Sequence, residues 1–280
     1  MPSLDLRPSP ISGQWYPAEA KLLAESVDAC LQAARLPALP GEVVGVMAPH
    51  AGLRYSGASA GHAFAAVRGL QPELAAVVAP LHYPSRQPFV TSAHQAYQTP
   101  LGPVPLDPEA VEALDAALRA RLDMGLARVR QDPEHALEIE LPFLQRALGG
   151  PFRLLPVMIH HPEPRFARAL GEALAQALSG RRALLVASTD LSHFYPQAEA
   201  QVYDSHFLRQ VEAMDPEGVL RADAEGLGYA CGRAAVAAVL WAARLLGASQ
   251  AHILHYSTSG EASGDTSRVV GYAAAAFTRP

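Results

Sequence analysis

Short apolar runs alternate with longer amphipathic stretches along most of the chain. Four runs are nearly free of charge, as is typical of strands buried on both faces of a sheet: Val43–Ala48, Leu74–Ala79, Phe152–Ile159 and Ala183–Ser188. Other stretches have apolar residues at helical spacing: Pro17–Arg35, Pro108–Leu122, Pro164–Leu178, Tyr203–Met214, Pro216–Ala224 and Ala234–Leu246. This alternation predicts an α/β protein with a central, mostly parallel sheet.

The remaining segments complete one expected domain that spans residues 1–280. The chain closes with two predicted strands, Ala251–Tyr256 and Arg268–Phe277. A glycine-rich turn precedes a helix that should begin near Ala58, and an Asp-Pro pair predicts the start of another helix, Asp132–Leu148. The sequence shows neither an internal repeat nor a linker, which favours a single domain.

Composition narrows the class of protein. Half of the 280 residues are hydrophobic, and the net charge of -5 argues against nucleic-acid binding through bulk electrostatics. No stretch approaches the roughly 20 apolar residues of a membrane span, and no secretory signal is visible near the beginning of the chain. The only two cysteines are Cys30 and Cys231, so a disulfide scaffold is excluded and a reducing cytoplasm is expected.

Ionisable residues follow each of the four buried strands. His50 and His82 come after the first two, the pair at 160–161 follows the third, and Asp190 and His193 follow the fourth. Because parallel strands place their carboxyl ends along one edge of a sheet, these side chains should lie close together. Two neutral imidazoles with one anionic ligand form a common open site for a transition metal.

The residues leave the third metal ligand open between two candidates. Asp190 would complete a 2-His-1-carboxylate site of the non-haem iron type. Cys231 lies in the glycine-rich turn Gly226–Gly232 ahead of a helix, where the helix dipole favours the thiolate. A thiolate ligand would favour copper(I), zinc or iron, whereas a buried, inert thiol is an equally simple interpretation of Cys231.

The acid–base candidates also have simpler alternatives. Asp190 and His193 are three residues apart, a spacing that suits a carboxylate orienting an imidazole for proton transfer. Asp190 could instead cap a helix. Glu134, His135 and Glu138 share one side of the expected helix, either as a charged face or as paired carboxylates for acid–base chemistry.

Several sequence blocks, in order along most of the chain, resemble the Memo family. They are Gly13-Gln-Trp-Tyr-Pro17, Ala48-Pro-His-Ala-Gly52, Arg54-Tyr-Ser-Gly57, Asp132-Pro-Glu-His135, Leu141-Pro-Phe-Leu144, Ser188-Thr-Asp-Leu-Ser-His193 and Ala230-Cys-Gly-Arg233. Microbial members of this family are often called AmmeMemoRadiSam system protein B. The blocks are jointly specific, so chance does not account for the resemblance.

The resemblance implies a three-layer α/β/α fold related to the class III extradiol dioxygenases, which use non-haem iron. Carried over residue by residue, the metal ligands of the family fall on His50, His82 and Cys231. The dioxygenases have a glutamate as third ligand, so the resemblance favours Cys231 over Asp190. It also implies that Asp190 and His193 are pocket residues, with His193 matching the acid–base histidine of the dioxygenases.

The same resemblance indicates the residues that meet the substrate. Trp15 lines the pocket in the family pattern. The matching blocks also supply Arg54, Tyr55 and His135 as candidates for substrate binding.

The chain departs from the family pattern at two places near these candidates. The family usually has Gly-Pro-Ser-His-His, where this chain has Ala79-Pro-Leu-His-Tyr83, so Leu81 and Tyr83 replace a serine and a histidine. Leu53 stands where a tyrosine is common. The ligand His82 is retained, but the polarity of the pocket and the substrate are expected to differ.

These observations lead to three hypotheses of different class. The first is a cytoplasmic redox protein that binds iron or copper in a dioxygenase-like pocket and acts on an unknown small molecule. The second is a non-catalytic module that binds a peptide or protein in the same pocket. The third is a zinc-dependent hydrolase. The family's genomic naming also implies a radical-SAM enzyme in the same pathway.

Overall fold

The four predicted buried strands lie side by side at the centre of one large sheet. The computed structural model describes residues 4–161 and 163–280. The four strands are β2 (Glu42–Ala48), β3 (Leu74–Pro80), β8 (Arg153–Ile159) and β9 (Ala183–Ser188). They run parallel in the order β2-β9-β3-β8. In the register, Ala48 of β2 lies opposite Ser188 of β9, which brings the segments after both strands together.

Further strands, most of them antiparallel to their neighbours, extend this sheet on both sides. On one side are β12 (Val269–Arg279), β11 (Gln250–Thr258) and β10 (His193–Tyr195). On the other side are β4 (Phe89–Ser92) and β7 (Ala127–Val129). The sheet is therefore mixed at its edges and parallel at its centre, as predicted.

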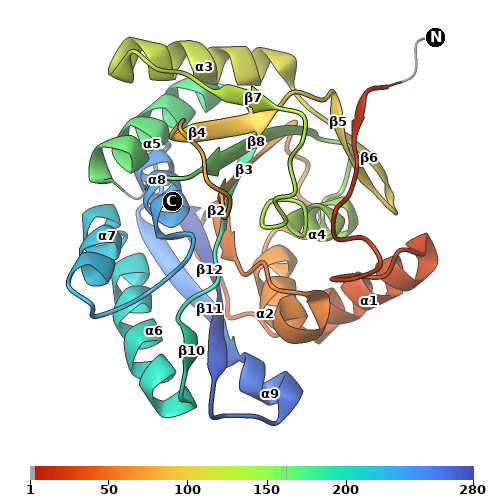
Figure 1. Ribbon diagram of the computed structural model, residues 1–280, viewed down its shortest axis with the longest axis vertical. Helices are drawn as coiled ribbons and strands as arrows, with labels where there is room; N and C mark the ends of the chain where they lie inside the picture. The colour runs from red at the N-terminus through yellow and green to blue at the C-terminus, as the bar shows by residue number, and fades with distance from the viewer. Residues whose placement is uncertain (1–3, 162) are drawn as a thin grey trace.

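Helices cover both faces of the sheet, so the molecule has three layers (Figure 1). One face carries α1 (Ala20–Ala33), α2 (Leu53–Ala65) and α4 (Glu140–Ala147). The other face carries α3 (Pro108–Leu122), α5 (Pro164–Leu178), α6 (Gln197–Glu212), α7 (Pro216–Ala224) and α8 (Arg233–Leu245). The three-layer α/β/α fold implied by the resemblance is confirmed.

The alternation of side chains along β3 explains why a sheet strand can be apolar throughout. Leu74, Ala76 and Val78 pack into the core on one face, and the residues between them pack into the core on the other. A small second sheet, formed by β1 (Leu6–Arg7), β5 (Ala96–Thr99) and β6 (Gly102–Pro105), ties the beginning of the chain to the main domain. A short helix, α9 (Ser259–Ser263), joins β11 to β12.

Two predicted helix starts were wrong, and in both cases the difference affects the candidate site. The helix expected from Asp132 begins only with α4 at Glu140, and the preceding residues form irregular turns. The reason is local, because the carboxylate of Glu134 accepts hydrogen bonds from the backbone N–H groups of His135 and Ala136. The helix expected near Ala58 begins earlier, at Leu53, directly after its N-cap residue Gly52.

Among the residues described, no helix is long and apolar enough to cross a membrane.

Candidate metal centre

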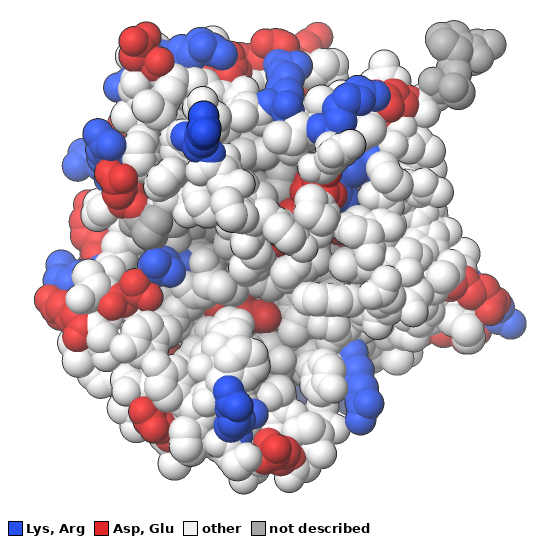
Figure 2. Space-filling model, in the orientation of Figure 1, with Lys and Arg blue, Asp and Glu red and all other residues white. Residues whose placement is uncertain are grey.

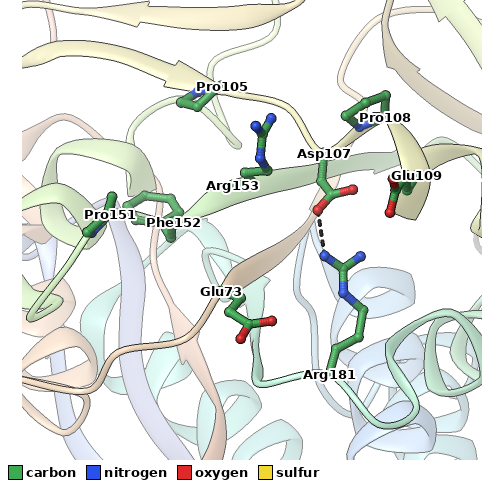
Figure 3. Close-up of a pocket in the computed structure, with 9 residues that line it drawn as sticks. All are labelled: Glu73, Pro105, Asp107, Pro108, Glu109, Pro151, Phe152, Arg153 and Arg181. Atoms are coloured by element: carbon green, nitrogen blue, oxygen red, sulfur yellow. Dashed lines mark hydrogen bonds and ion pairs between the residues drawn. The ribbon is translucent and has the colours of Figure 1, made fainter.

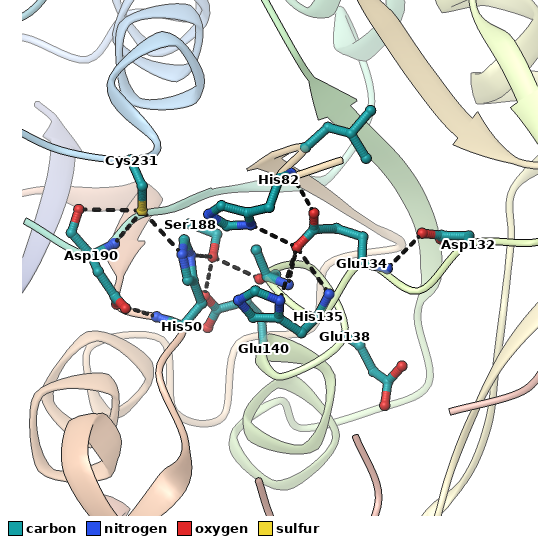
Figure 4. A network of polar contacts seen from close by, with 12 residues as sticks. His50, His82, Asp132, Glu134, His135, Glu138, Glu140, Ser188, Asp190 and Cys231 are labelled. Carbon is teal, nitrogen blue, oxygen red and sulfur yellow. Dashed lines mark hydrogen bonds and ion pairs between the residues drawn. The ribbon is translucent and has the colours of Figure 1, made fainter. Parts of the chain in front are cut away.

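The histidines predicted at the strand ends meet at the carboxyl edge of the parallel strands. His50 follows β2 and His82 follows β3, while Cys231 comes directly before Gly232, the N-cap residue of α8 (Figure 4). Glu134 and His135 come from the irregular turns ahead of α4. The molecular surface is hollowed near the centre of the face drawn in Figure 1, and acidic side chains are visible within the hollow (Figure 2).

His50 is the most enclosed of the three histidines. Only 1% of it is exposed, and its backbone N–H donates to Asp190 Oδ1 over 2.8 Å. Its Nδ1 lies 2.9 Å from Ser188 Oγ, and its Nε2 lies 3.1 Å from Cys231 Sγ. Burial lowers the pKa of His50 well below its usual value, so the imidazole is neutral and suited to metal binding.

His82 is held by Glu134 through two hydrogen bonds. Its Nδ1 lies 2.9 Å from Glu134 Oε1, and its backbone N–H donates to Oε2 over 2.6 Å. Burial opposes ionisation of Glu134, but the bonds to His82 outweigh it and lower the pKa of the carboxyl to about 2. Because the carboxylate accepts the Nδ1 proton, Nε2 of His82 keeps its lone pair for a metal.

His135 joins the two predicted histidines. One ring nitrogen from each of His50, His82 and His135 lies within 4.8 Å of the others, so these three residues could hold a metal ion. The rings of His82 and His135 stack with centroids 4.8 Å apart. Burial lowers the pKa of His135 to about 4, which keeps this ring neutral.

The sequence predicts His135 as a substrate-binding residue and does not connect it with the metal ligands. The signal in the sequence is that His135 directly follows Glu134. In the structure the Glu134 carboxylate both orients His82 and accepts the backbone N–H of His135, which brings the two rings together. The ring of Trp15 packs against the ring of His135, and the two ring centroids are 4.2 Å apart. Trp15 therefore contacts the histidine cluster, and its role in substrate binding stays a prediction.

Cys231 lies beside His50, with its Sγ 3.1 Å from Nε2 of the imidazole. Its Sγ accepts a hydrogen bond from the backbone N–H of Asp190 at 3.3 Å and shares a cavity of about 80 Å³ with His82. Burial raises the pKa of the Cys231 thiol, and the nearby Asp190 raises it further. Burial therefore opposes the thiolate that the helix dipole was expected to favour, and a thiolate at Cys231 stays a prediction.

Asp190 and His193 do not form the predicted pair. Asp190 Oδ1 accepts the backbone N–H of His50, whereas Nδ1 of His193 lies 2.8 Å from the carbonyl oxygen of Leu191. The side chain of Asp190 is 5% exposed, and burial raises its pKa to about 7. The Leu191 carbonyl oxygen, rather than the Asp190 carboxylate, therefore orients the exposed ring of His193.

The other predicted substrate-binding residues lie at the first turn of α2. The Trp15 carbonyl oxygen accepts the backbone N–H of Leu53, which ties the early loop to this helix. Arg54 and Tyr55 follow and are exposed, with the guanidinium carbon of Arg54 5.6 Å from the centre of the Tyr55 ring. Both were expected on a loop but belong to the helix.

Two buried residues of the site had no signal in the sequence. Ser188 ends β9 and contacts His50, while Glu140 is the first residue of α4 and contacts Ser188 (Figure 4). Both are fully buried. A serine at a strand end and a glutamate in a helical pattern are too common to indicate a site.

A cavity also lies away from the histidines. It measures about 630 Å³ and is lined by residues at the amino ends of β3 and β8, including Glu73 and Arg153 (Figure 3). An ion pair of 2.6 Å between Arg181 and Asp107 spans part of it. This cavity is on the edge of the sheet opposite the histidines.

The fold and the site define an α/β/α protein with a histidine cluster at the carboxyl edge of its parallel strands. A family model described as "Memo-like protein" matches residues 7–276. The chain is 34% identical to a "MEMO1 family protein" of Methanopyrus kandleri, which covers 96% of this chain and 98% of the relative. It is 32% identical to a "MEMO1 family protein" of Nitrosopumilus maritimus, and that match covers 97% of this chain and 99% of the relative. The chain belongs to the Memo family.

Proposed function

We propose that this protein binds one iron or copper ion in the cluster and carries out redox chemistry on a small organic substrate. His50 and His82 supply two imidazole ligands, and Cys231 supplies the third. The observation that carries this proposal is the convergence of these donors at one strand edge. Nε2 of His50 lies 3.1 Å from Cys231 Sγ, and both imidazoles are fixed through Nδ1.

The donor set fits a transition metal better than a hard cation. Imidazole and thiolate are ligands for iron, copper and zinc, whereas magnesium and calcium prefer oxygen. A bound cation would displace the proton of the Cys231 thiol, since a coordinating thiol is deprotonated outright. The ring of His135 stacks on that of His82 and offers a further neutral nitrogen, which lies within 4.8 Å of a ring nitrogen of His50 and of His82.

The residues around the ligands are suited to proton transfer. The metal, when bound, would supply electron transfer and polarise a substrate oxygen. Asp190, with a pKa of about 7, exchanges protons near neutral pH. Nδ1 of His193 is held at the Leu191 carbonyl oxygen, which leaves Nε2 of this exposed ring as a proton acceptor. We assign proton transfer to these two residues acting separately.

Metal analysis of anaerobically purified protein tests the proposal. We expect about one equivalent of iron or copper in the wild type and a large loss in His50→Ala and Cys231→Ser. The variant Cys30→Ser is the matched control, because this cysteine is part of α1 and packs against Gly57 and Gly61 of α2 rather than against the cluster. Equal metal content in all four proteins would contradict the proposal. One equivalent of zinc without a redox response would favour a hydrolase.

A second candidate function is supported by exposed aromatic residues near the site. Tyr83 follows His82 and Phe194 follows His193, and their exposed fractions are 43% and 60%. Tyr55 at the start of α2 is 41% exposed. Exposed apolar side chains beside a pocket are typical of binding surfaces for peptides or proteins. Oxygen consumption or turnover that vanishes in His193→Ala would count against this binding module.

We also propose that the protein works in the reducing cytoplasm. Cys30 and Cys231 are both free. Oxidation of Cys231 would remove the thiol donor of the proposed site. Iron or copper binding that is lost on mild oxidation and restored by a thiol reductant is the expected behaviour. Binding that persists unchanged after Cys231 is oxidised would contradict it.

A further inference from the structure

The hydroxyl of Ser188 lies at the centre of three short polar contacts. Ser188 Oγ is 2.8 Å from the carbonyl oxygen of Ala136 and 2.5 Å from Glu140 Oε1. It is also 2.9 Å from Nδ1 of His50. Ser188 and Glu140 are fully buried, and His50 is 1% exposed, so these contacts are shielded from bulk solvent.

A count of donors and acceptors decides how these contacts are arranged. A serine hydroxyl has one proton and two acceptor lone pairs. The Ala136 carbonyl oxygen can only accept, so it takes the proton of Ser188. Glu140 and His50 must then both donate to Ser188 Oγ, and Glu140 can donate only if it carries a proton.

An ionised Glu140 would leave more groups unsatisfied. If the Ser188 proton went to a Glu140 carboxylate, the buried Ala136 carbonyl would lose this partner. Glu140 Oε2 has no hydrogen-bond partner among the residues described, so the anion would also be poorly solvated. Burial raises the pKa of Glu140 well above its usual value, which agrees with the donor count.

We propose that Glu140 is a neutral carboxylic acid that donates to Ser188 Oγ and thereby makes Ser188 the acceptor for the Nδ1 proton of His50. The Nε2 lone pair of His50 is then directed toward Cys231 and the metal position. Glu140 is a positioning residue, because it acts through Ser188. The proposal concerns the metal-free protein, and only its consequence for metal affinity rests on the proposed function.

The arrangement differs from the one at His82, where the ionised Glu134 accepts the Nδ1 proton directly. A carboxylate partner increases the basicity of an imidazole ligand, whereas a hydroxyl that accepts from a neutral acid does so less. The two histidine ligands are therefore inequivalent. His82 is the electron-richer ligand, and His50 is fixed in one tautomer without an added negative charge.

The test uses metal-free protein in which the histidines are labelled with ¹⁵N. Two-bond ¹⁵N–¹H correlation spectra distinguish an imidazole protonated on Nδ1 from one protonated on Nε2. We expect the Nδ1–H form of His50 in the wild type and in Glu140→Gln, because the glutamine amide can donate to Ser188 in place of the acid. Ser188→Ala removes the acceptor, and the Nε2–H form should appear.

Infrared difference spectra between the wild type and Glu140→Gln test the charge of Glu140 directly. We expect a carboxylic acid C=O band in the wild type that is absent from the variant. A carboxylate band instead, or a change of His50 tautomer in Glu140→Gln, would overturn the proposal. Thermal melting of each variant establishes that it is folded before its spectra are compared.

Titration with ferrous iron under anaerobic conditions links the arrangement to the metal. We expect Ser188→Ala to weaken binding about 10- to 100-fold and Glu140→Gln to weaken it by less than about tenfold. If the protein binds no metal, the proposed function fails, while the two spectroscopic results still decide the role of Glu140. Equal weakening in both variants would contradict the neutral-acid assignment.

Discussion

Glu134 is the residue that orders most of the candidate site. Its two carboxylate oxygens accept three backbone N–H groups and the ring Nδ1 of His82. A carboxylate with this many donors stays ionised despite burial. One side chain therefore sets the tautomer of His82, the place of His135 and the irregular backbone between them.

Replacing Glu134 with Gln should weaken metal binding by about 10- to 100-fold, since second-sphere carboxylates of metal-binding histidines have effects of this size. The pKa of His82, which Glu134 raises above its usual value, should fall at the same time. Isothermal titration with ferrous iron and NMR titration of the histidines measure the two effects. Glu172→Gln, on the solvent side of α5, is the matched control. An unchanged pKa of His82 would contradict this role of Glu134.

The sequence predicted which residues meet but not how their side chains pair. His50, His82, Asp190 and Cys231 were placed together because each follows a strand or precedes a helix at the same edge. The pairing of Asp190 with His193 failed because residue spacing does not fix side-chain direction, and the backbone N–H of His50 offered the carboxylate a closer donor. The state of Cys231 depended on burial, which no local motif records.

At the scale of elements, the register of β2 with β9 accounts for the position of the site. Ala48 lies opposite Ser188, so residues 50 and 190 emerge at the same level. These strands were predictable because their apolar runs are continuous and end at a proline or a polar residue. The helix before Leu148 was mispredicted because a capping pattern at Asp132 cannot reveal that the carboxylate of Glu134, two residues later, competes for the backbone N–H groups.

The contact between α2 and β11 contains a histidine pair that should respond to pH. His62 and His255 stack with ring centroids 4.1 Å apart, and Ser59 Oγ lies 2.9 Å from Nδ1 of His255. Burial lowers the pKa of His255, and His62 lowers it further. The folded state therefore binds this proton less readily than the unfolded chain does.

Stability should decrease as the pH falls below about 6.5, where histidine in the unfolded chain becomes protonated first. Above that pH both states are neutral at His255, and the residue contributes no pH dependence. In His255→Gln the fall in melting temperature between pH 7 and pH 5 should be smaller than in the wild type. Thermal unfolding at both values measures this difference. A larger fall in the variant would contradict the prediction that protonation of His255 destabilises the folded state.

At the scale of the whole molecule, Arg7 joins the beginning of the chain to the segment that carries the site. Its guanidinium forms ion pairs of 2.7 Å with Asp132 and 2.5 Å with Glu138, and it donates to the Glu134 carbonyl oxygen over 2.6 Å. Arg7 is 1% exposed. The small β1-β5-β6 sheet and the segment that carries Glu134 and His135 are therefore held together by buried charges.

Replacing Arg7 with Met should lower the free energy of unfolding by about 3–5 kcal/mol, because it leaves two buried carboxylates without their cation. Denaturant unfolding measures the loss. Arg128→Met is the matched control, since the ion pair of Arg128 with Glu112 is exposed and its removal should cost much less. Equal losses of unfolding free energy in the two variants would contradict the prediction that the buried ion pairs of Arg7 contribute more to stability than the exposed ion pair of Arg128.

The central claim is that a metal ion is bound by imidazoles and by the Cys231 sulfur at the carboxyl edge of the sheet. X-ray absorption at the edge of the metal in anaerobically purified protein tests it most directly. We predict nitrogen neighbours together with one sulfur neighbour, with the sulfur lost in Cys231→Ser and retained in Cys30→Ser. A metal without a sulfur neighbour in the wild type, or a spectrum that Cys231→Ser and His50→Ala leave unchanged, would contradict the claim.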